Sequence, residues 1–326
     1  MFKMSELFDS FGRHINYLRI SVTDRCNLRC IYCMPPEGVS LIPHSEILSY
    51  EEILTVVQVA ARLGINKVRL TGGEPLVRAE LPKLVRMLSQ VEGIEEVSLT
   101  TNGTLLKKYV VELKQAGLRR VNISLDTLKA DRFQHITRLG ELEDVLEGIE
   151  AATDAGFHPV KINVVVMRGI NDDEVLDFAN ITYKEGWHVR FIELMPFASV
   201  ADFVPSSEIR QHIMSPGALE PCLPIIGNGP AKYYYLPRAK GTIGFISPIT
   251  EPFCSSCNRM RLTSDGKLRP CLLGDGEIDL KRPLRSNASI SEIECLILKA
   301  VASKPEHHRL VDGAVSIKRK MCQIGG

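Results

Sequence analysis

The sequence has no excess of charge of either sign and no long hydrophobic run. Its 40 Lys and Arg residues balance 39 Asp and Glu residues, which leaves a formal net charge of +1. A chain so balanced has no global field to attract nucleic acid or an anionic membrane, so any site for a polyanion must be local. No stretch approaches the ~18 consecutive apolar residues that indicate a membrane-spanning helix. We therefore expect neither nucleic acid nor a membrane as a partner.

The N-terminal segment also lacks the features of a secretion signal. Acidic residues occur within it, and no apolar stretch is followed by small residues. This absence predicts a cytoplasmic protein. Disulfides explain nine cysteines poorly in a reducing compartment, and six of the nine fall into two tight triplets. Metal binding is the better interpretation of these cysteines.

Between residues 16 and 196, short apolar runs alternate with longer helical patterns, which is typical of a parallel sheet with crossover helices. The six strand candidates are rich in Val, Ile and Leu: Tyr17–Val22, Lys67–Thr71, Val97–Thr101, Val121–Leu125, Val160–Met167 and His188–Leu194. Gly64, Gly117 and Gly156 follow helical stretches, where a residue with positive φ commonly ends a helix. Six units fall short of the eight that close a complete barrel. We therefore expect an α/β fold, a partial (β/α)6 barrel of TIM type with its chemistry at the carboxyl ends of the strands.

After about residue 196 the alternation gives way to connections rich in Pro and Gly. Short strands are predicted at Tyr233–Leu236 and Gly241–Ile246, and a final helix over Ser291–Ser303. Arg259–Thr263 and Lys267–Pro270 form a predicted hairpin, because the Asp265-Gly266 pair between them tolerates the positive φ of a tight turn. We divide the chain into an N-terminal arm (1–15), the partial barrel (16–225) and a C-terminal β-containing region (226–326).

The first cysteine triplet, Cys26, Cys30 and Cys33, has the spacing C-x3-C-x2-C and directly follows the first strand candidate. A barrel presents an active-site loop at that position. A [4Fe-4S] cluster normally takes four cysteine ligands, so three would leave one iron with an open coordination position. Zinc with a distant fourth ligand is the alternative at this spacing.

The segment Cys26-Asn27-Leu28-Arg29-Cys30-Ile31-Tyr32-Cys33 resembles the signature of the radical S-adenosylmethionine (SAM) enzymes. The resemblance implies that the open iron binds the methionine amine and carboxylate of SAM, and that an electron from the cluster releases a 5′-deoxyadenosyl radical. Thr71-Gly72-Gly73-Glu74-Pro75 alone is compatible with an ordinary strand-to-helix turn. Beside the triplet it resembles the loop that approaches the SAM amine. The resemblance implies SAM contacts from Tyr32, Gly73, Ser124 and Met195.

The second triplet, Cys254, Cys257 and Cys271, has the spacing C-x2-C-x13-C across the predicted hairpin, which folds Cys271 back toward the first pair. Spacing alone does not separate a zinc ribbon from an iron–sulfur cluster. The longer phrase from Cys254 to Cys271 resembles the auxiliary-cluster segment of the GTP 3′,8-cyclases, and the resemblance covers essentially the whole chain. It implies a second [4Fe-4S] cluster with three cysteine ligands, whose open iron receives the guanine of the substrate.

The three remaining cysteines, Cys222, Cys295 and Cys322, have no comparable spacing, and we assign them no role. Cys295 falls in the final predicted helix, where we expect a buried structural thiol.

Basic residues occupy strand positions where apolar ones are expected: Arg19, Lys67, Arg69, Lys161, Arg190, Arg259 and Arg261. Burying such charges without partners would be costly. Strand alternation places Lys67 and Arg69 on one face, and the guanidinium group suits phosphate oxygens. The alternative is that each of these residues pairs with a carboxylate, such as Asp126 or Glu193, or marks an exposed strand end.

In the resembling family, residues at these positions bind GTP. The resemblance implies GTP contacts from Arg19, Arg69, Thr100, Lys161, Arg259 and Arg261, together with Lys67 and Arg190. It also implies that the Gly325-Gly326 tail reaches the active site. The sequence has no Gly-x4-Gly-Lys-Ser/Thr loop, so side chains would hold the nucleotide, which argues against ordinary GTP hydrolysis.

The resemblance implies a complete activity. The radical would abstract hydrogen from C3′ of GTP, and the C3′ radical would attack C8 of the guanine. Reduction by one electron and protonation would then give (8S)-3′,8-cyclo-7,8-dihydroguanosine 5′-triphosphate, the first step of molybdenum cofactor biosynthesis. It further implies an electron donor such as flavodoxin or ferredoxin, a downstream cyclic pyranopterin monophosphate synthase, and a homodimer as one form of assembly. Two alternatives stay open: a peptide-modifying radical SAM maturase with an auxiliary cluster, and a non-catalytic zinc-binding protein.

Overall fold

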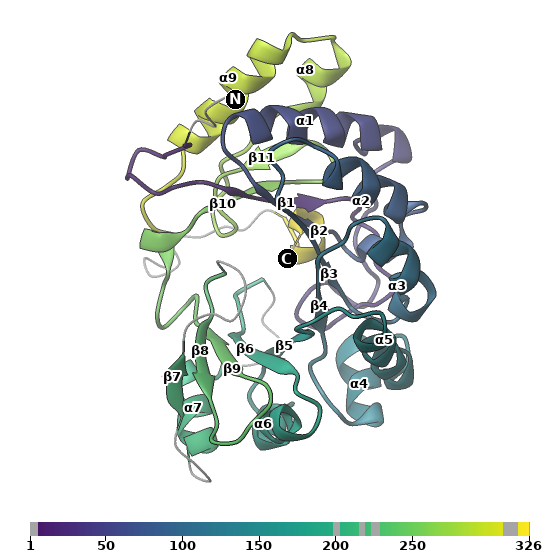
Figure 1. Ribbon diagram of the computed structural model, residues 1–326, viewed down its shortest axis with the longest axis vertical. Helices are drawn as coiled ribbons and strands as arrows, with labels where there is room; N and C mark the ends of the chain where they lie inside the picture. The colour runs from purple at the N-terminus through teal and green to yellow at the C-terminus, as the bar shows by residue number, and fades with distance from the viewer. Residues whose placement is uncertain (1–5, 198–202, 215–218, 223–228, 309–318, 326) are drawn as a thin grey trace.

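The computed structural model describes residues 6–197, 203–214, 219–222, 229–308 and 319–325 (Figure 1). Six strands lie side by side in chain order and are all parallel: β1 (Tyr17–Ser21), β2 (Lys67–Thr71), β3 (Glu96–Thr101), β4 (Arg120–Ser124), β5 (Lys161–Val166) and β6 (His188–Glu193). Their bounds differ from the predicted ones by no more than one residue. The expected α/β fold with a partial, open barrel is therefore confirmed.

Helices cover the outer face of these strands (Figure 1): α1 (Tyr50–Arg62), α2 (Leu81–Ser89), α3 (Leu106–Gln115), α4 (Ala130–Thr137), α5 (Leu142–Asp154) and α6 (Val175–Lys184). In α1, Ser49 and Glu52 form a capping box at the N-terminus. Ile53, Val56 and the apolar residues at helical spacing from them are buried. Burial of each large apolar side chain stabilises the folded state by about 1.5–3 kcal/mol. Gly64 follows with φ +110, the positive φ predicted from the sequence.

The strands that follow β6 in the chain extend the barrel sheet at both of its edges instead of forming a separate one. At one edge, β9 (Ile243–Ile246) pairs in parallel with β6 and is followed outward by β8 (Lys232–Tyr235) and β7 (Glu220–Cys222). At the other edge, β10 (Arg259–Leu262) pairs in parallel with β1, and the predicted hairpin joins it to β11 (Lys267–Arg269), with β12 (Ile278–Asp279) outermost. The division at residues 225 and 226 stays a proposal, since strands on both sides of it belong to one sheet.

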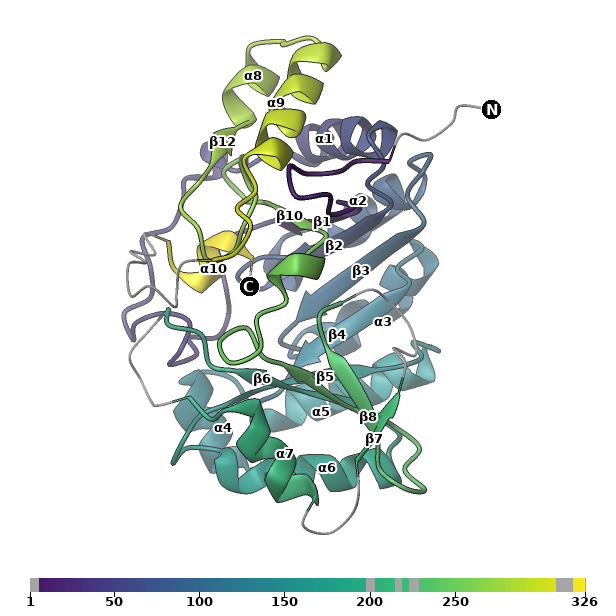
Figure 2. The same ribbon diagram turned by 90° about the vertical axis from the view of Figure 1, so that its left-hand side faces the viewer.

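In the described ranges, the remaining α-helices are α7 (Ser206–Met214), α8 (Lys281–Arg285), α9 (Ile290–Ala302) and α10 (Met321–Ile324). The helix α9 packs beside α1 (Figure 2), and Ile293 and Ile297 on its inner face are buried. Cys295 lies off that face and is exposed, so the expectation of a buried thiol was wrong. The short α10 brings the C-terminal end of the chain to the middle of the molecule (Figure 1). Within the described ranges, no helix has the length and apolar character needed to cross a bilayer.

Candidate active site

One cavity of about 340 Å³ opens on the inner face of the sheet. Both cysteine triplets border it, as do most of the basic residues predicted on the strands. The C-terminal segment borders it as well, through Met321 and Cys322 of α10. The topology therefore gathers residues from both ends of the chain around one space.

The first triplet lies in the loop that leaves β1. Backbone hydrogen bonds pin this loop to the end of α4, from Arg29 N to Thr137 O and from Ile31 N to Ile136 O, each 2.9 Å. Burial raises the pKa of Cys26 to about 12 and also raises that of Cys30. Burial thus disfavours the free thiolates, whereas a bound metal favours the deprotonated form of a cysteine ligand.

The loop after β2 packs directly on the backbone of the triplet loop. A Cβ on Gly73 would lie 2.3 Å from Arg25 O, so no other residue fits without backbone movement. Gly73 N donates to Thr23 O at 2.8 Å, and Glu74 N donates to Arg25 O at 2.8 Å. The glycine that the sequence suggested for close ligand approach is therefore also required by contact between two loops.

Buried Glu74 links the loops that follow β2 and β3. Its carboxylate accepts hydrogen bonds from Leu76 N (3.0 Å), Asn102 N (2.7 Å) and Thr101 Oγ1 (2.7 Å). Burial raises its pKa to about 7 despite these donors. The sequence predicts a role for the glycines and the proline of this motif, and the structure shows that its glutamate organises the loops around the cavity.

The four residues expected at a SAM site all border the cavity: Tyr32, Gly73, Ser124 and Met195. Tyr32 Oη donates to Asp126 at 2.7 Å, and Asp126 also accepts from Val165 N at 2.8 Å. Burial raises the pKa of Asp126 to about 6. Asp126 thus fixes the tyrosine of the first triplet against β4 and β5.

The carboxylates considered as partners of the strand cations are engaged elsewhere. Asp126 holds Tyr32, as described, and Glu193 accepts from Ser206 N, Ile249 N and Thr250 N, each at 3.0 Å. Glu193 therefore anchors α7 and the segment after β9 to the end of β6. Neither carboxylate explains the basic residues inside the barrel.

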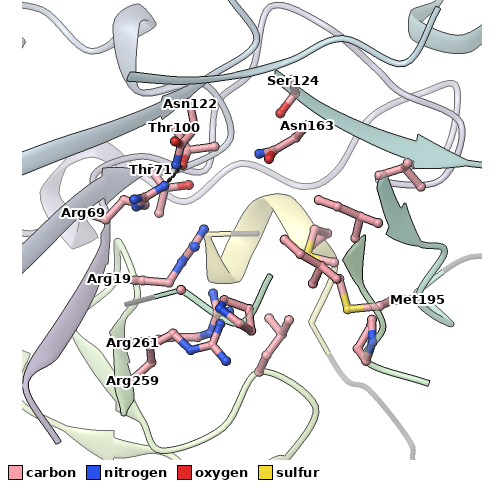
Figure 3. Close-up of a pocket in the computed structure, with 18 of the residues that line it drawn as sticks. Arg19, Arg69, Thr71, Thr100, Asn122, Ser124, Asn163, Met195, Arg259 and Arg261 are labelled. Carbon is pink, nitrogen blue, oxygen red and sulfur yellow. Dashed lines mark hydrogen bonds between the residues drawn. The ribbon is translucent and has the colours of Figure 1, made fainter. Parts of the chain in front are cut away.

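Those basic residues lie side by side because their strands are in register. Arg19 is opposite Arg69 on one neighbouring strand and opposite Arg261 on the other. Figure 3 shows Arg19, Arg259 and Arg261 gathered on one side of the cavity, with Arg69 above them hydrogen-bonded to Thr100 (Nη1 to Oγ1, 3.4 Å). Burial, together with the neighbouring Arg259, lowers the pKa of Arg261 to about 10. So many buried cations favour an anionic ligand.

Lys161 and Arg190 continue this basic surface on β5 and β6. Burial and then the charge of Arg190 lower the pKa of Lys161 to about 7. Lys67, at the start of β2, does not border the cavity. Gly325 O accepts hydrogen bonds from Arg261 Nη1 (2.8 Å) and Arg19 Nη2 (3.5 Å), so the tail reaches these arginines. Gly326 lies outside the described residues.

The hairpin places all three cysteines of the second triplet at the same cavity, as the sequence predicted. Cys254 and Cys257 precede β10, and Cys271 follows β11. Arg259 Nη2 donates to Cys257 Sγ at 3.6 Å. Burial opposes ionisation of Cys257, but Arg259 and Lys304 outweigh it and lower its pKa to about 6. A thiol that ionises so readily suits a metal ligand.

The donor sets of both triplets fit iron–sulfur clusters in number and kind, with three cavity-facing thiols each. Across the described ranges, no three His, Cys, Asp or Glu side chains converge closely enough to hold a single metal ion. The thiols border the cavity instead of meeting at one point.

Several cavity residues were missed at the sequence level. Asn122 Nδ2 and Asn163 Oδ1 are buried without a hydrogen-bond partner on adjacent strands. Alternation could have found them, because they lie two residues from Ser124 and Lys161 respectively. Buried Cys322 contacts Cys33 through their side chains, and Lys304 lies beside Cys257. Neither contact has a sequence signal, because each joins segments that are distant along the chain.

Comparisons with known proteins agree over nearly the whole chain. Residues 20–181 match the Radical SAM superfamily, and residues 187–310 match the family described as Molybdenum Cofactor Synthesis C. A protein of Pelotomaculum thermopropionicum is 54% identical over 98% of this chain and 99% of its own, and one of Moorella thermoacetica is 53% identical over the same shares. One of Desulforamulus reducens is 52% identical over 98% of this chain and all of its own. All three are named GTP 3′,8-cyclase.

Solved structures give the same fold at much lower identity. Streptococcus suis SuiB bound to S-adenosylmethionine has a TM-score of 0.61 and 14% identity, over 84% of this chain and 66% of SuiB. SuiB bound to its precursor peptide SuiA has a TM-score of 0.63, also at 14% identity, over 95% of this chain and 70% of SuiB. This likeness establishes the fold alone.

Proposed function

Since this chain belongs to the GTP 3′,8-cyclase family of radical SAM enzymes, we propose that it converts GTP into (8S)-3′,8-cyclo-7,8-dihydroguanosine 5′-triphosphate, the first step of molybdenum cofactor biosynthesis. One observation carries the proposal: a single cavity is bordered by both cysteine triplets and by the basic residues of the strands. The high identity to cyclases favours this reaction over modification of a peptide, because SuiB, whose structure holds a precursor peptide, shares only the fold at 14% identity.

The family implies a [4Fe-4S] cluster and SAM. We assign the cluster to Cys26, Cys30 and Cys33, and the SAM contacts to Tyr32, Gly73, Ser124 and Met195. When bound, this cluster and SAM supply a reducing electron and a hydrogen-abstracting radical. The packed loops around Gly73 and Glu74 keep the triplet, and therefore any bound SAM, at the carboxyl ends of the strands.

A second [4Fe-4S] cluster at Cys254, Cys257 and Cys271 is the finer part of the proposal. Its support is the low pKa of Cys257 and the donors that surround the thiols. A cluster there would lie in the same cavity as the first and could bind the guanine base through an iron that has no cysteine ligand.

The strand cations are proposed to bind the triphosphate, which brings about four negative charges. The set is Arg19, Arg69, Lys161, Arg190, Arg259 and Arg261, with Thr100 beside Arg69. Held in this way, GTP would present C3′ of its ribose to the SAM site, with C8 of its guanine close to C3′. Holding reacting atoms close together in this way accelerates a reaction. Lys67 has less support, because it does not border the cavity. The carbonyl oxygen of Gly325 accepts hydrogen bonds from the guanidinium groups of Arg19 and Arg261, so the triphosphate and the C-terminal tail must share these donors.

The cytoplasmic location, the flavodoxin or ferredoxin reductant, the downstream cyclic pyranopterin monophosphate synthase and a homodimer stay predictions. The downstream enzyme follows from the chemistry, since a cyclised nucleoside triphosphate still has to be rearranged into a pterin.

The test is an anaerobic reaction of the reconstituted protein with SAM, dithionite and GTP, resolved by liquid chromatography and mass spectrometry. We expect 5′-deoxyadenosine together with a new nucleotide of the same mass as GTP, because the product is an isomer of the substrate. ATP in place of GTP is the matched control and should give no isomer. Release of 5′-deoxyadenosine with GTP unchanged would contradict the proposal.

A further inference from the structure

A lysine that the proposed reaction does not use lies directly behind the second triplet. Lys304, which follows the C-terminal end of α9, is 3% exposed. Its Nζ donates hydrogen bonds to Arg259 O (2.9 Å) and to Pro270 O (2.6 Å). Arg259 lies two residues after Cys257, and Pro270 immediately precedes Cys271. One ammonium group therefore joins the two arms of the hairpin that carry the cysteines.

The segment that contains Lys304 also directs donors at the sulfur atoms. The Lys304 side chain hydrogen-bonds to Cys257, and the backbone N–H of His308 hydrogen-bonds to Cys254. Arg259 Nη2 donates to Cys257 as well. A protonated thiol is a weak acceptor, whereas a thiolate accepts charge-assisted hydrogen bonds strongly. The arrangement therefore suits ionised sulfur.

A carboxylate balances the positive charge of the neighbouring Arg13, whereas cysteines take that place for Lys304. Arg13 donates to Cys254 O at 2.8 Å, and its own charge is met by buried Asp9 (Nε to Oδ2, 2.6 Å). None of the ion pairs in the described ranges joins Lys304 to a carboxylate; the groups that favour its charged form are Cys257 and Cys271. A buried ammonium is costly unless an anion compensates it. Thiolates held by a metal would supply that anion.

We propose that Lys304 is the counterion of an anionic iron–sulfur cluster at Cys254, Cys257 and Cys271 and positions its ligands, an inference that rests on the second cluster of the proposed function. Three thiolates outweigh the positive charge of a [4Fe-4S] core, so this cluster carries net negative charge, which increases on reduction. A hydrogen-bonded cation at a ligand sulfur stabilises the reduced form more than the oxidised one. Lys304 therefore makes the cluster easier to reduce, and through the carbonyls of Arg259 and Pro270 it holds the ligands in register.

The experiment measures two properties of the anaerobically reconstituted holoenzyme: iron per chain, and the reduction midpoint of each cluster in a titration followed by electron paramagnetic resonance. Added SAM changes the signal of the first cluster and so identifies it. The variants are Lys304→Gln, which removes the charge, and Lys304→Arg, which keeps it. Lys114→Met is the matched control, because exposed Lys114 also donates to a carbonyl, Gly156 O, at 2.7 Å, away from the cysteines.

We expect the Arg variant and the Lys114 control to behave like the unchanged protein. In Lys304→Gln, we expect one of two changes at the auxiliary cluster. Either the cluster is lost and the iron content falls to one cluster per chain, or the cluster remains and is harder to reduce. In the second case the ratio of reduced to oxidised cluster, measured at the midpoint potential of the unchanged protein, should fall roughly tenfold, which corresponds to the loss of one charge-assisted hydrogen bond. The first cluster should keep its midpoint. Equal iron and equal midpoints in Lys304→Gln would overturn the inference while leaving two clusters in place. One cluster per chain in the unchanged protein would instead contradict the second-cluster part of the proposed function.

Discussion

At the scale of single residues, cations on buried strands line one side of the cavity, where we propose that the triphosphate binds. Arg19, Arg69 and Arg261 were predictable from sequence, because buried parallel strands otherwise exclude charge. Lys67 obeys the same alternation as Arg69 but lies at the start of its strand, away from the cavity. Alternation gives the face of a strand but not the depth at which a ligand lies. Asn122 and Asn163 could not be predicted in this way, because burying an uncharged amide costs less free energy than burying a charge. An amide on a strand therefore does not by itself indicate a ligand site.

Arg261→Ala should weaken GTP binding by roughly tenfold to a hundredfold, the range expected for losing hydrogen bonds from a charged group. SAM binding should be unchanged, because the expected SAM contacts lie on other elements. Equilibrium binding of each ligand under anaerobic conditions measures both effects. Arg168→Ala is the control, since Arg168 pairs with Glu208 at 2.7 Å on the exposed surface. Equal affinity for GTP in the Arg261 variant would exclude this residue from the site.

Lys161 should make GTP binding depend on pH. Its pKa of about 7 means that the free protein loses this proton as the pH rises through about 7. A bound triphosphate favours the charged form, so binding above that pH must take up a proton, and affinity should fall as the pH rises toward about 9. Calorimetry in two buffers with different heats of ionisation measures the proton uptake. Lys161→Met should abolish it; unchanged uptake in that variant would assign the titration to another group.

At the scale of elements, the spacing of each triplet identified its loop, and the hairpin between Cys257 and Cys271 was correctly predicted. What spacing could not show is the convergence of distant elements on those loops. The loop after β2 packs on the backbone of the first triplet, and the segment after α9 hydrogen-bonds to the second. Such contacts depend on packing in three dimensions, for which local sequence has no signal. The exposed Cys295 illustrates the same limit, because one helix residue can lie beside or beyond the buried face.

Gly73→Ala should displace the loop after β2, because its Cβ would meet Arg25 O at 2.3 Å. We expect SAM affinity to fall at least about tenfold, since backbone shifts of this kind misplace the groups that bind ligand. Iron content and equilibrium SAM binding are the measurements. Gly276→Ala is the control, because the nearest atom to its Cβ would be Pro270 Cγ at 3.7 Å. Normal SAM affinity in the Gly73 variant would show that the loop tolerates the shift.

At the scale of the whole molecule, a single sheet, of twelve strands in the part of the chain that the structure describes, carries both triplets to the same cavity. The six-strand barrel was predictable, because each strand and its crossover helix are neighbours in sequence. The pairing of β10 with β1 was not predictable from the sequence, because more than two hundred residues separate the two strands. The residues of an edge strand do not specify which distant strand it pairs with. This pairing is what places the second triplet and the arginines of β10 beside the barrel strands.

Removing either triplet should therefore separate the two halves of the chemistry. With all three cysteines of the second triplet changed to Ala, we expect half the iron per chain, retained cleavage of SAM by dithionite-reduced protein and loss of the cyclised nucleotide. The same change in the first triplet should abolish SAM cleavage. Iron analysis and quantification of 5′-deoxyadenosine distinguish the two variants. Full nucleotide product without the second triplet would contradict a role for it in the reaction.

The most direct test of the central claim follows one hydrogen atom. Reconstituted protein is supplied anaerobically with SAM, dithionite and GTP deuterated at C3′, and the 5′-deoxyadenosine formed is analysed by mass spectrometry. If both ligands bind in the one cavity as proposed, deuterium appears in 5′-deoxyadenosine together with a cyclised nucleotide. Cleavage of SAM without deuterium transfer would contradict GTP as the substrate held against the SAM site.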